Sequence, residues 1–146
     1  MSSYEITCDR TRLDIGAIHD FLSQAYWSAG IPRAVVERAI ENSLCFGVFH
    51  DEQQVGFARV ITDKATFAYL ADVYIVSEHR GKGLSRRLDQ EIIEHPDLQG
   101  LRRILLATRD AHGLYAKFGF KPLAAPDRIM EIHNPSIYRN GGKRAL

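Results

Sequence analysis

The sequence predicts an α+β fold with a mixed, largely antiparallel central sheet flanked by helices, in the order βααβββαβαββ. Three consecutive stretches rich in aromatic and β-branched residues, at 44–50, 54–62 and 66–76, are separated by turn signals and predict an antiparallel meander. Two helical patterns precede the meander, and a glycine-rich junction with a third helical pattern follows it. No repeat or low-complexity stretch divides the chain, so we expect one domain over residues 1–146.

The N-terminal elements are expected to be a short strand and two helices. The strand is predicted at residues 4–7. The first helix begins at about Asp14, which can cap it, because apolar residues then recur at helical spacing: Ile15, Ile18 and Leu22. The second helix has Pro32 in its first turn and ends at Asn42.

The C-terminal half continues with a third helix and shorter elements. Apolar residues every four positions, Leu84, Leu88 and Ile92, predict an amphipathic helix that ends before Pro96. A strand at 103–108 and a short helix at 111–118, ended by Gly119, should follow. Two late strands are predicted at 121–123 and 129–133, and residues 134–146 read as a loose tail.

Composition and charge exclude several classes of protein. The net charge of +1 indicates neither nucleic acid nor an anionic membrane as a partner. Cys8 and Cys45 form no CxxC pair, and the histidines show no HxxxH spacing, so we expect no disulfide framework and no metal. The N-terminus resembles no signal peptide, and apolar runs are shorter than a membrane span, which favours a cytoplasmic protein.

The junction at residues 75–85 is the most informative segment for function. A predicted strand leads into a glycine-rich loop that opens directly onto a helix. The first turn of a helix has N–H groups without intrahelical partners, and with the macrodipole these groups favour a phosphate. Gly81 and Gly83 allow close approach to the backbone. The spacing fits neither a P-loop nor a dinucleotide fingerprint.

Two motifs resemble those of a known family. The segment Arg80-Gly81-Lys82-Gly83-Leu84-Ser85 resembles the Arg/Gln-x-x-Gly-x-Gly/Ala coenzyme A signature of the GNAT acetyltransferases, with Ser85 where Gly or Ala is usual. The family also has a tyrosine a few residues before Gly-Phe, and Tyr115 stands in that position before Gly119-Phe120. The pair is fairly specific, and the resemblance covers roughly residues 4–133.

The resemblance implies a GNAT-like fold with acetyl-CoA as co-substrate. The strand at about 73–76 would splay from the strand that ends at Thr108, and the pantetheine arm would lie in this wedge against main-chain groups near Val73 and Ile75. Main-chain N–H groups of the loop would hold the pyrophosphate, and Arg80 or Lys82 would add charge. Thr108 stands where many members have asparagine. The loop residues concerned are Gly81, Lys82, Gly83, Leu84 and Ser85.

Three side chains are candidates for the chemistry. Tyr115 is expected to act as general acid toward the departing thiolate, and an N–H near Ile75 to meet the oxyanion. Period-two alternation places Asp72 and Tyr74 on the face opposite Val73 and Ile75, so Asp72 is the first candidate for holding or deprotonating the amine. His112 is the second candidate base. Each also has a structural interpretation, as a core aromatic, a polar strand residue and a solvated histidine.

The acceptor region is predicted less sharply. Tyr26 and Trp27 lie between the first two helices, where related enzymes line the acceptor pocket, although a single tryptophan is also typical of simple packing. The leading hypothesis is transfer of an acetyl group from acetyl-CoA to a primary amine of a small molecule or a peptide. The alternative is a non-catalytic acyl-CoA-binding sensor or regulatory module. The sequence leaves open the acceptor, the acyl length and a homodimer.

Overall fold

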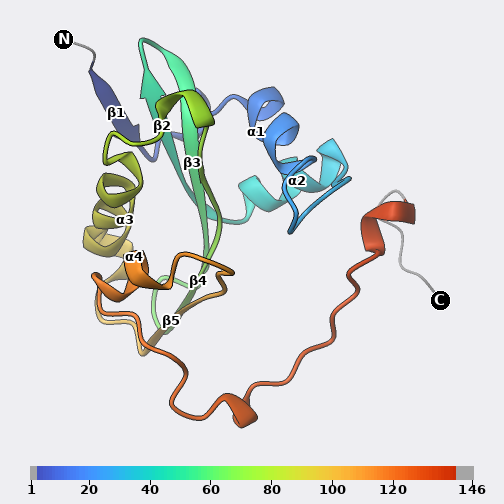
Figure 1. Ribbon diagram of the computed structural model, residues 1–146, viewed down its shortest axis with the longest axis vertical. Helices are drawn as coiled ribbons and strands as arrows, with labels where there is room; N and C mark the ends of the chain where they lie inside the picture. The colour runs from blue at the N-terminus through green and yellow to red at the C-terminus, as the bar shows by residue number, and fades with distance from the viewer. Residues whose placement is uncertain (1–2, 141–146) are drawn as a thin grey trace.

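The computed structural model describes residues 3–140 and places one mixed five-stranded sheet between helices (Figure 1). The strands lie in chain order. The pairs β1–β2, β2–β3 and β3–β4 are antiparallel, while β5 runs parallel to β4. The predicted α+β class and the mixed, largely antiparallel sheet are confirmed. The strands are β1 (Tyr4–Thr7), β2 (Leu44–His50), β3 (Gln53–Thr62), β4 (Phe67–Ile75) and β5 (Arg103–Leu106).

Helices α1 (Ile15–Leu22) and α2 (Arg33–Glu41) cover one end of one sheet face. Asp14 caps α1 as predicted, since its carboxylate accepts a hydrogen bond of 3.0 Å from the N–H of Ala17. The apolar side chains of the two helices pack on inward residues of the sheet. This core contains Ile18, Leu22, Ile31, Val36, Ile40, Cys45, Phe57 and Tyr74.

Helix α3 (Leu84–Glu94) covers the opposite face, and the short helix α4 (His112–Ala116) lies next to it (Figure 1). The predicted stripe of Leu84, Leu88 and Ile92 is buried to 2% exposure or less. Full burial of such a side chain stabilises a fold by about 1.5–3 kcal/mol. This core therefore fixes α3, and with it the loop that precedes it, against the sheet.

Strand β4 contains an irregularity at Asp72. Phe57 and Arg59 are two residues apart on β3, but their partners Tyr74 and Ala71 are three apart on β4. Asp72 adopts a left-handed conformation with a φ of 54°, which is uncommon for a residue with a side chain. The extra residue is the mark of a β-bulge.

The bulge changes which residues of β4 share a face. Ala68 and Leu70 belong to the core under α3, whereas Tyr74 belongs to the core under α1 and α2. Strict alternation would have kept all three together. Downstream of the bulge the prediction holds, because Tyr74 lies on the face opposite Val73 and Ile75.

The two late strands are not formed. Residues 121–133 make extended backbone and a single 3-10 turn at Pro126–Arg128, with no strand after β5 up to residue 140. A strand needs a neighbour to satisfy its backbone groups, and no described segment pairs with this one. We call residues 121–136 the C-terminal arm.

The part of the expected loose tail that the structure describes is ordered against the body. Residues Ile137–Asn140 form a 3-10 turn, and Tyr138 packs into the core under α1 and α2. Residues 141–146 lie outside the described range.

Candidate active site

A cavity opens where β4 and β5 separate. Their parallel pairing ends at Leu70 and Leu106, and a cavity of about 850 Å³ lies beyond this point. This cavity corresponds to the wedge between the two strands that the family resemblance implies. The sequence-predicted residues that line it are Tyr26, Trp27, Asp72, Val73, Ile75, Arg80, Ser85, Thr108 and Tyr115.

The glycine-rich loop borders the cavity at the N-terminus of α3. Gly81 and Gly83 have φ values of 78° and 77°, and a Cβ built on either would meet no atom within 4 Å. Gly83 is the N-cap of α3 and offers no side chain to its first N–H groups. Exposed main chain, an uncapped helix N-terminus and left-handed glycines together offer accessible N–H donors that suit a phosphate.

The other loop residues have distinct roles. Leu84 is buried in the core under α3, so only its main chain can contribute to binding. The Arg80 Nε donates a hydrogen bond of 2.8 Å to the Ile75 carbonyl, which fixes the turn out of β4. Gly81, Lys82 and Gly83 are exposed and lie outside the cavity lining.

Tyr115 reaches the cavity from α4 and is only 9% exposed. Thr108 positions that helix, because its Oγ1 accepts a hydrogen bond of 3.0 Å from the N–H of Ala111, immediately before α4. Burial, and after it the negative charge of Asp89, raises the pKa of Tyr115 well above its ordinary value. The hydroxyl therefore stays protonated through the physiological pH range.

Asp89 is a buried acid that sequence reasoning did not single out. It lies one turn after Ser85 on α3 and is 2% exposed. Neither carboxyl oxygen has a hydrogen-bond partner among the described residues. Burial raises the pKa of Asp89 from 3.8 to about 7, because a charge without a partner is costly in an apolar environment.

Asp72 is held by two donors on the other side of the cavity. The Trp27 Nε1 donates to its Oδ1 at 2.8 Å, and the Arg59 Nε donates to its Oδ2 at 2.8 Å. The ion pair with Arg59 is mostly buried, with side-chain exposures of 18% for Arg59 and 11% for Asp72. The carboxylate is thus fixed in place, with its remaining lone pairs available to a ligand.

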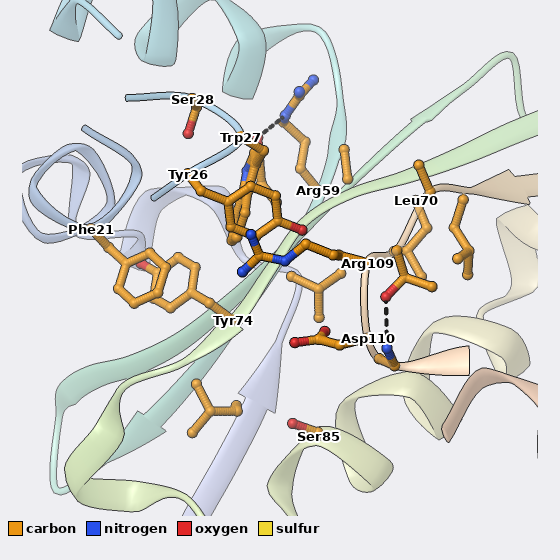
Figure 2. A pocket seen from close by; sticks show the side chains of 18 of the residues that line it. Phe21, Tyr26, Trp27, Ser28, Arg59, Leu70, Tyr74, Ser85, Arg109 and Asp110 are labelled. Atoms are coloured by element: carbon orange, nitrogen blue, oxygen red, sulfur yellow. Dashed lines mark hydrogen bonds and ion pairs between the residues drawn. The ribbon is translucent and has the colours of Figure 1, made fainter. Parts of the chain in front are cut away.

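Aromatic side chains, among them Phe21, Tyr26, Trp27 and Tyr74, form one wall of the cavity (Figure 2). Phe21 and Tyr74 stack with ring centroids 3.7 Å apart and an angle of 7°. Tyr26 meets Trp27 edge to face at 5.1 Å, and the Arg109 guanidinium lies 3.9 Å from the centroid of the Tyr26 ring. Such surfaces suit cationic and aromatic groups.

The structure places one predicted site residue outside the cavity and adds lining residues that were not predicted. His112 is exposed and is not part of the cavity lining. The cavity is also lined by residues that were not predicted, among them Arg59, Arg109, Asp110 and Tyr138. Arg59 carried a usable signal, as a lone charge within an apolar strand pattern. Tyr138 carried none, because it follows the arm in a segment without periodicity.

Over residues 3–140, no three His, Cys, Asp or Glu side chains gather in a way that could bind a metal ion. Every helix in that range is too short or too polar to cross a bilayer.

A mixed sheet that opens between its parallel strands, beside a glycine-rich helix N-terminus and a buried tyrosine, is the architecture of an acyltransferase class. The comparison with protein families agrees: the acetyltransferase (GNAT) family model matches residues 14–120. The chain belongs to this family.

Individual relatives support the assignment. A crystal structure of a candidate GNAT acetyltransferase from Xanthomonas campestris pv. campestris is 55% identical, with a TM-score of 0.92, over 94% of this chain and 98% of the other. A candidate acetyltransferase from Gibberella zeae is 34% identical over 78% of this chain and 76% of its own. A candidate acetyltransferase from Clostridium acetobutylicum, solved with acetyl-CoA, shares the fold at 16% identity and a TM-score of 0.65, over 91% and 96% of the two chains.

Proposed function

We propose that the protein is an N-acetyltransferase that moves the acetyl group of acetyl-CoA to a primary amine of a small molecule or a peptide. One observation carries the proposal: the residues at the two ends of the donor loop, Arg80 and Ser85, line the same cavity as the Asp72 carboxylate, the aromatic wall and Tyr115. Family membership and the acetyl-CoA in the distant Clostridium structure support the choice of donor.

Acetyl-CoA fits the residues present. The N–H groups at the start of α3, from Gly81 to Ser85, would bind the pyrophosphate, and the space above the two glycines is open. Val73 and Ile75 line the cavity beyond the point where β4 is no longer paired with β5. Their main-chain groups would bind the pantetheine amides. Lys82 is exposed beside the loop and would add positive charge.

Tyr115 is the proposed general acid. Its raised pKa keeps the hydroxyl protonated, so it is always a donor. Complete proton transfer to a thiolate is uphill, since a thiol has a pKa of about 8.5 and tyrosine about 10 even in water. We therefore assign to Tyr115 a hydrogen bond that strengthens as charge develops on the departing sulfur. Water takes the proton that the amine loses and protonates the released thiolate.

Asp72 is the proposed site for the acceptor amine. It lines the cavity and is fixed by Arg59 and Trp27, so it can accept a hydrogen bond from an ammonium or amine at low reorganisation cost. Orienting the amine, with proton removal to water, is the role that these contacts support best.

A thiol-release assay across a panel of amines tests the proposal. We expect acetyl-CoA-dependent release of free thiol with at least one primary amine, and no release with the matching tertiary amine as control. A thermal-shift titration with acetyl-CoA accompanies it, because a ligand at a hundred times its Kd adds about 2.7 kcal/mol of stability.

The two measurements separate the alternatives. Binding without turnover on any amine would favour the sensor or regulatory module. Absence of both binding and turnover would overturn the assignment of the cavity to acetyl-CoA.

A further inference from the structure

One charged residue of the cavity lining, Arg109, has no role in the proposed chemistry. It lies in the loop between β5 and α4, and none of the ion pairs among residues 3–140 includes it or its neighbour Asp110. Figure 2 shows its guanidinium over the Tyr26 ring, on the aromatic side of the cavity, with Ser85 of the glycine-rich loop well apart from it. Arg109 therefore lies on the side of the cavity that we assign to the acceptor.

Local contacts hold Arg109 in this place. The hydrogen bond of 3.0 Å from the N–H of Ala111 to the Thr108 Oγ1 closes the turn that carries Arg109. The guanidinium lies 3.9 Å from the centroid of the Tyr26 ring. A ring attracts a cation through its face and takes no oxygen acceptor from it, so the N–H groups of the guanidinium stay available to a ligand.

The same aromatic residues connect Arg109 with the carboxylate of Asp72. Tyr26 meets Trp27 edge to face with ring centroids 5.1 Å apart, and the Trp27 Nε1 donates to the Asp72 Oδ1 at 2.8 Å. Contacts between neighbouring side chains therefore lead from the cation to the anion along one wall. A ligand on this wall meets a positive and a negative group at separate points.

This arrangement discriminates among amines. A diamine or polyamine would bring a second positive charge into a lining that already contains Arg59, Arg80 and Arg109, and like charges in a confined site oppose binding. An amine that carries a carboxylate would instead offer Arg109 an anion. The planar guanidinium matches a carboxylate with two parallel hydrogen bonds, which gives both affinity and orientation.

We infer that the acceptor is a small zwitterionic amine, whose amine group binds Asp72 and whose carboxylate binds Arg109. The inference rests on the proposed function, because Asp72 is the proposed site of the amine that receives the acetyl group. The cavity of about 850 Å³ must also hold the pantetheine arm, which leaves room for a small molecule. Arg109 is then the residue that selects the acceptor.

Matched pairs of acceptors test this inference. Glycine, β-alanine and γ-aminobutyrate are each compared with their own carboxamide, so that each pair keeps the primary amine and loses the negative charge. Thiol release with acetyl-CoA gives kcat/KM for each compound. We expect a preference of about tenfold or more for the carboxylate in at least one pair, as for hydrogen bonds to a charged group.

Substitution of Arg109 should remove this preference. In Arg109→Gln the two members of each pair should have similar kcat/KM values, while the KM for acetyl-CoA stays unchanged. Arg109→Glu should favour ethylenediamine over the carboxylates. Arg102→Gln, at an exposed arginine outside the lining of this cavity, is the control and should keep the wild-type preference. An unchanged preference in Arg109→Gln, or a higher KM for acetyl-CoA in its place, overturns the inference.

Calorimetric binding of the same compounds, with free coenzyme A at saturation, separates the inference from the proposed function. We expect the carboxylates to bind more tightly than their carboxamides, and the difference to be lost in Arg109→Gln. That binding preference without thiol release from acetyl-CoA would support the acceptor class and overturn acetyl transfer. Thiol release with equal kcat/KM for both members of every pair would overturn the acceptor class and support acetyl transfer. Failure of every carboxylate to bind also overturns the inference.

Discussion

The two sides of the cavity are built in different ways. The donor side that we propose is one continuous segment, from Ile75 to Ser85, and it would bind through main-chain groups and the dipole of α3. The proposed acceptor side is assembled from side chains of remote segments, among them Trp27, Arg59 and Asp72. The donor side should therefore tolerate side-chain changes and be sensitive to backbone changes, while the acceptor side should show the reverse.

Tyr115→Phe is expected to have the largest effect, because Tyr115 is the proposed donor to the departing thiolate. Loss of one preorganised donor to a developing charge lowers turnover by about 10²–10³-fold, whereas the KM for acetyl-CoA should change little. Steady-state thiol release measures both quantities. Tyr69→Phe, a second tyrosine of the cavity lining, is the control. Equal turnover in Tyr115→Phe and wild type would remove Tyr115 from the mechanism.

Asp89→Asn should change how the free energy of unfolding depends on pH, because Asp89 is a buried acid on the helix that follows the donor loop. The pKa of Asp89 is raised from 3.8 to about 7 in the folded protein, so the folded state retains the proton that the unfolded state has lost. Wild-type stability should fall as the pH rises from about 4 to 7 and stay low above 7. Between about pH 5 and pH 8 the wild type should lose roughly 2–3 kcal/mol more than the variant.

Urea unfolding at the two pH values measures this difference. Glu91→Gln, an exposed acid on the same helix, is the control and should behave as the wild type. Parallel pH dependence in Asp89→Asn and wild type would show that Asp89 is not the titrating group.

Asp72→Asn should impair the reaction with the amine and leave acetyl-CoA binding unchanged. Hydrogen bonds to a charged group contribute about 1.5–3 kcal/mol, so kcat/KM for the amine should fall roughly thirtyfold, with the KM for acetyl-CoA unchanged. Bisubstrate kinetics separate the two. Asp110→Asn, the other carboxylate of the cavity lining, should have a smaller effect. A rise in the KM for acetyl-CoA instead would assign Asp72 to the donor side.

Gly83→Ala should give the smallest effect, which should be confined to the binding of acetyl-CoA. A left-handed φ of 77° costs a residue with a Cβ about 1 kcal/mol, so the KM for acetyl-CoA should rise about fivefold and that for the amine should not. Gly113→Ala on α4, which needs no positive φ, is the control. Unchanged acetyl-CoA kinetics would argue against the loop as the pyrophosphate site.

Local signals explain which elements could be predicted. The meander from β2 to β4 and helix α3 agree with their predicted bounds within two residues, because turn residues and helical spacing are read within a few positions. The predictions of strands at 121–123 and 129–133 were wrong. The apolar pattern is present, but a strand also needs a neighbouring strand to pair with, and a local pattern does not show whether such a neighbour exists.

The same distinction holds for the candidate site. Tyr115 and the loop could be named because each lies within a short motif. The partnership of Arg59 with Asp72, across the irregular pairing of β3 and β4, could not be predicted. Tyr138 and Asp89 were missed because their positions depend on tertiary packing alone. Roles for all of these residues remain predictions.

The bulge makes Asp72 an insertion in an otherwise regular strand. If Asp72 is left out of the count, Leu70, Val73 and Ile75 alternate toward α3 without interruption, and Tyr74 keeps its place beside Phe21. A chain one residue shorter at this point could thus form both cores with the same side chains, free of the strained backbone that Asp72 requires. The side-chain alternation of the strand thus does not require Asp72, and its deletion would remove the carboxylate from the cavity and leave the mostly buried guanidinium of Arg59 without its ion-pair partner.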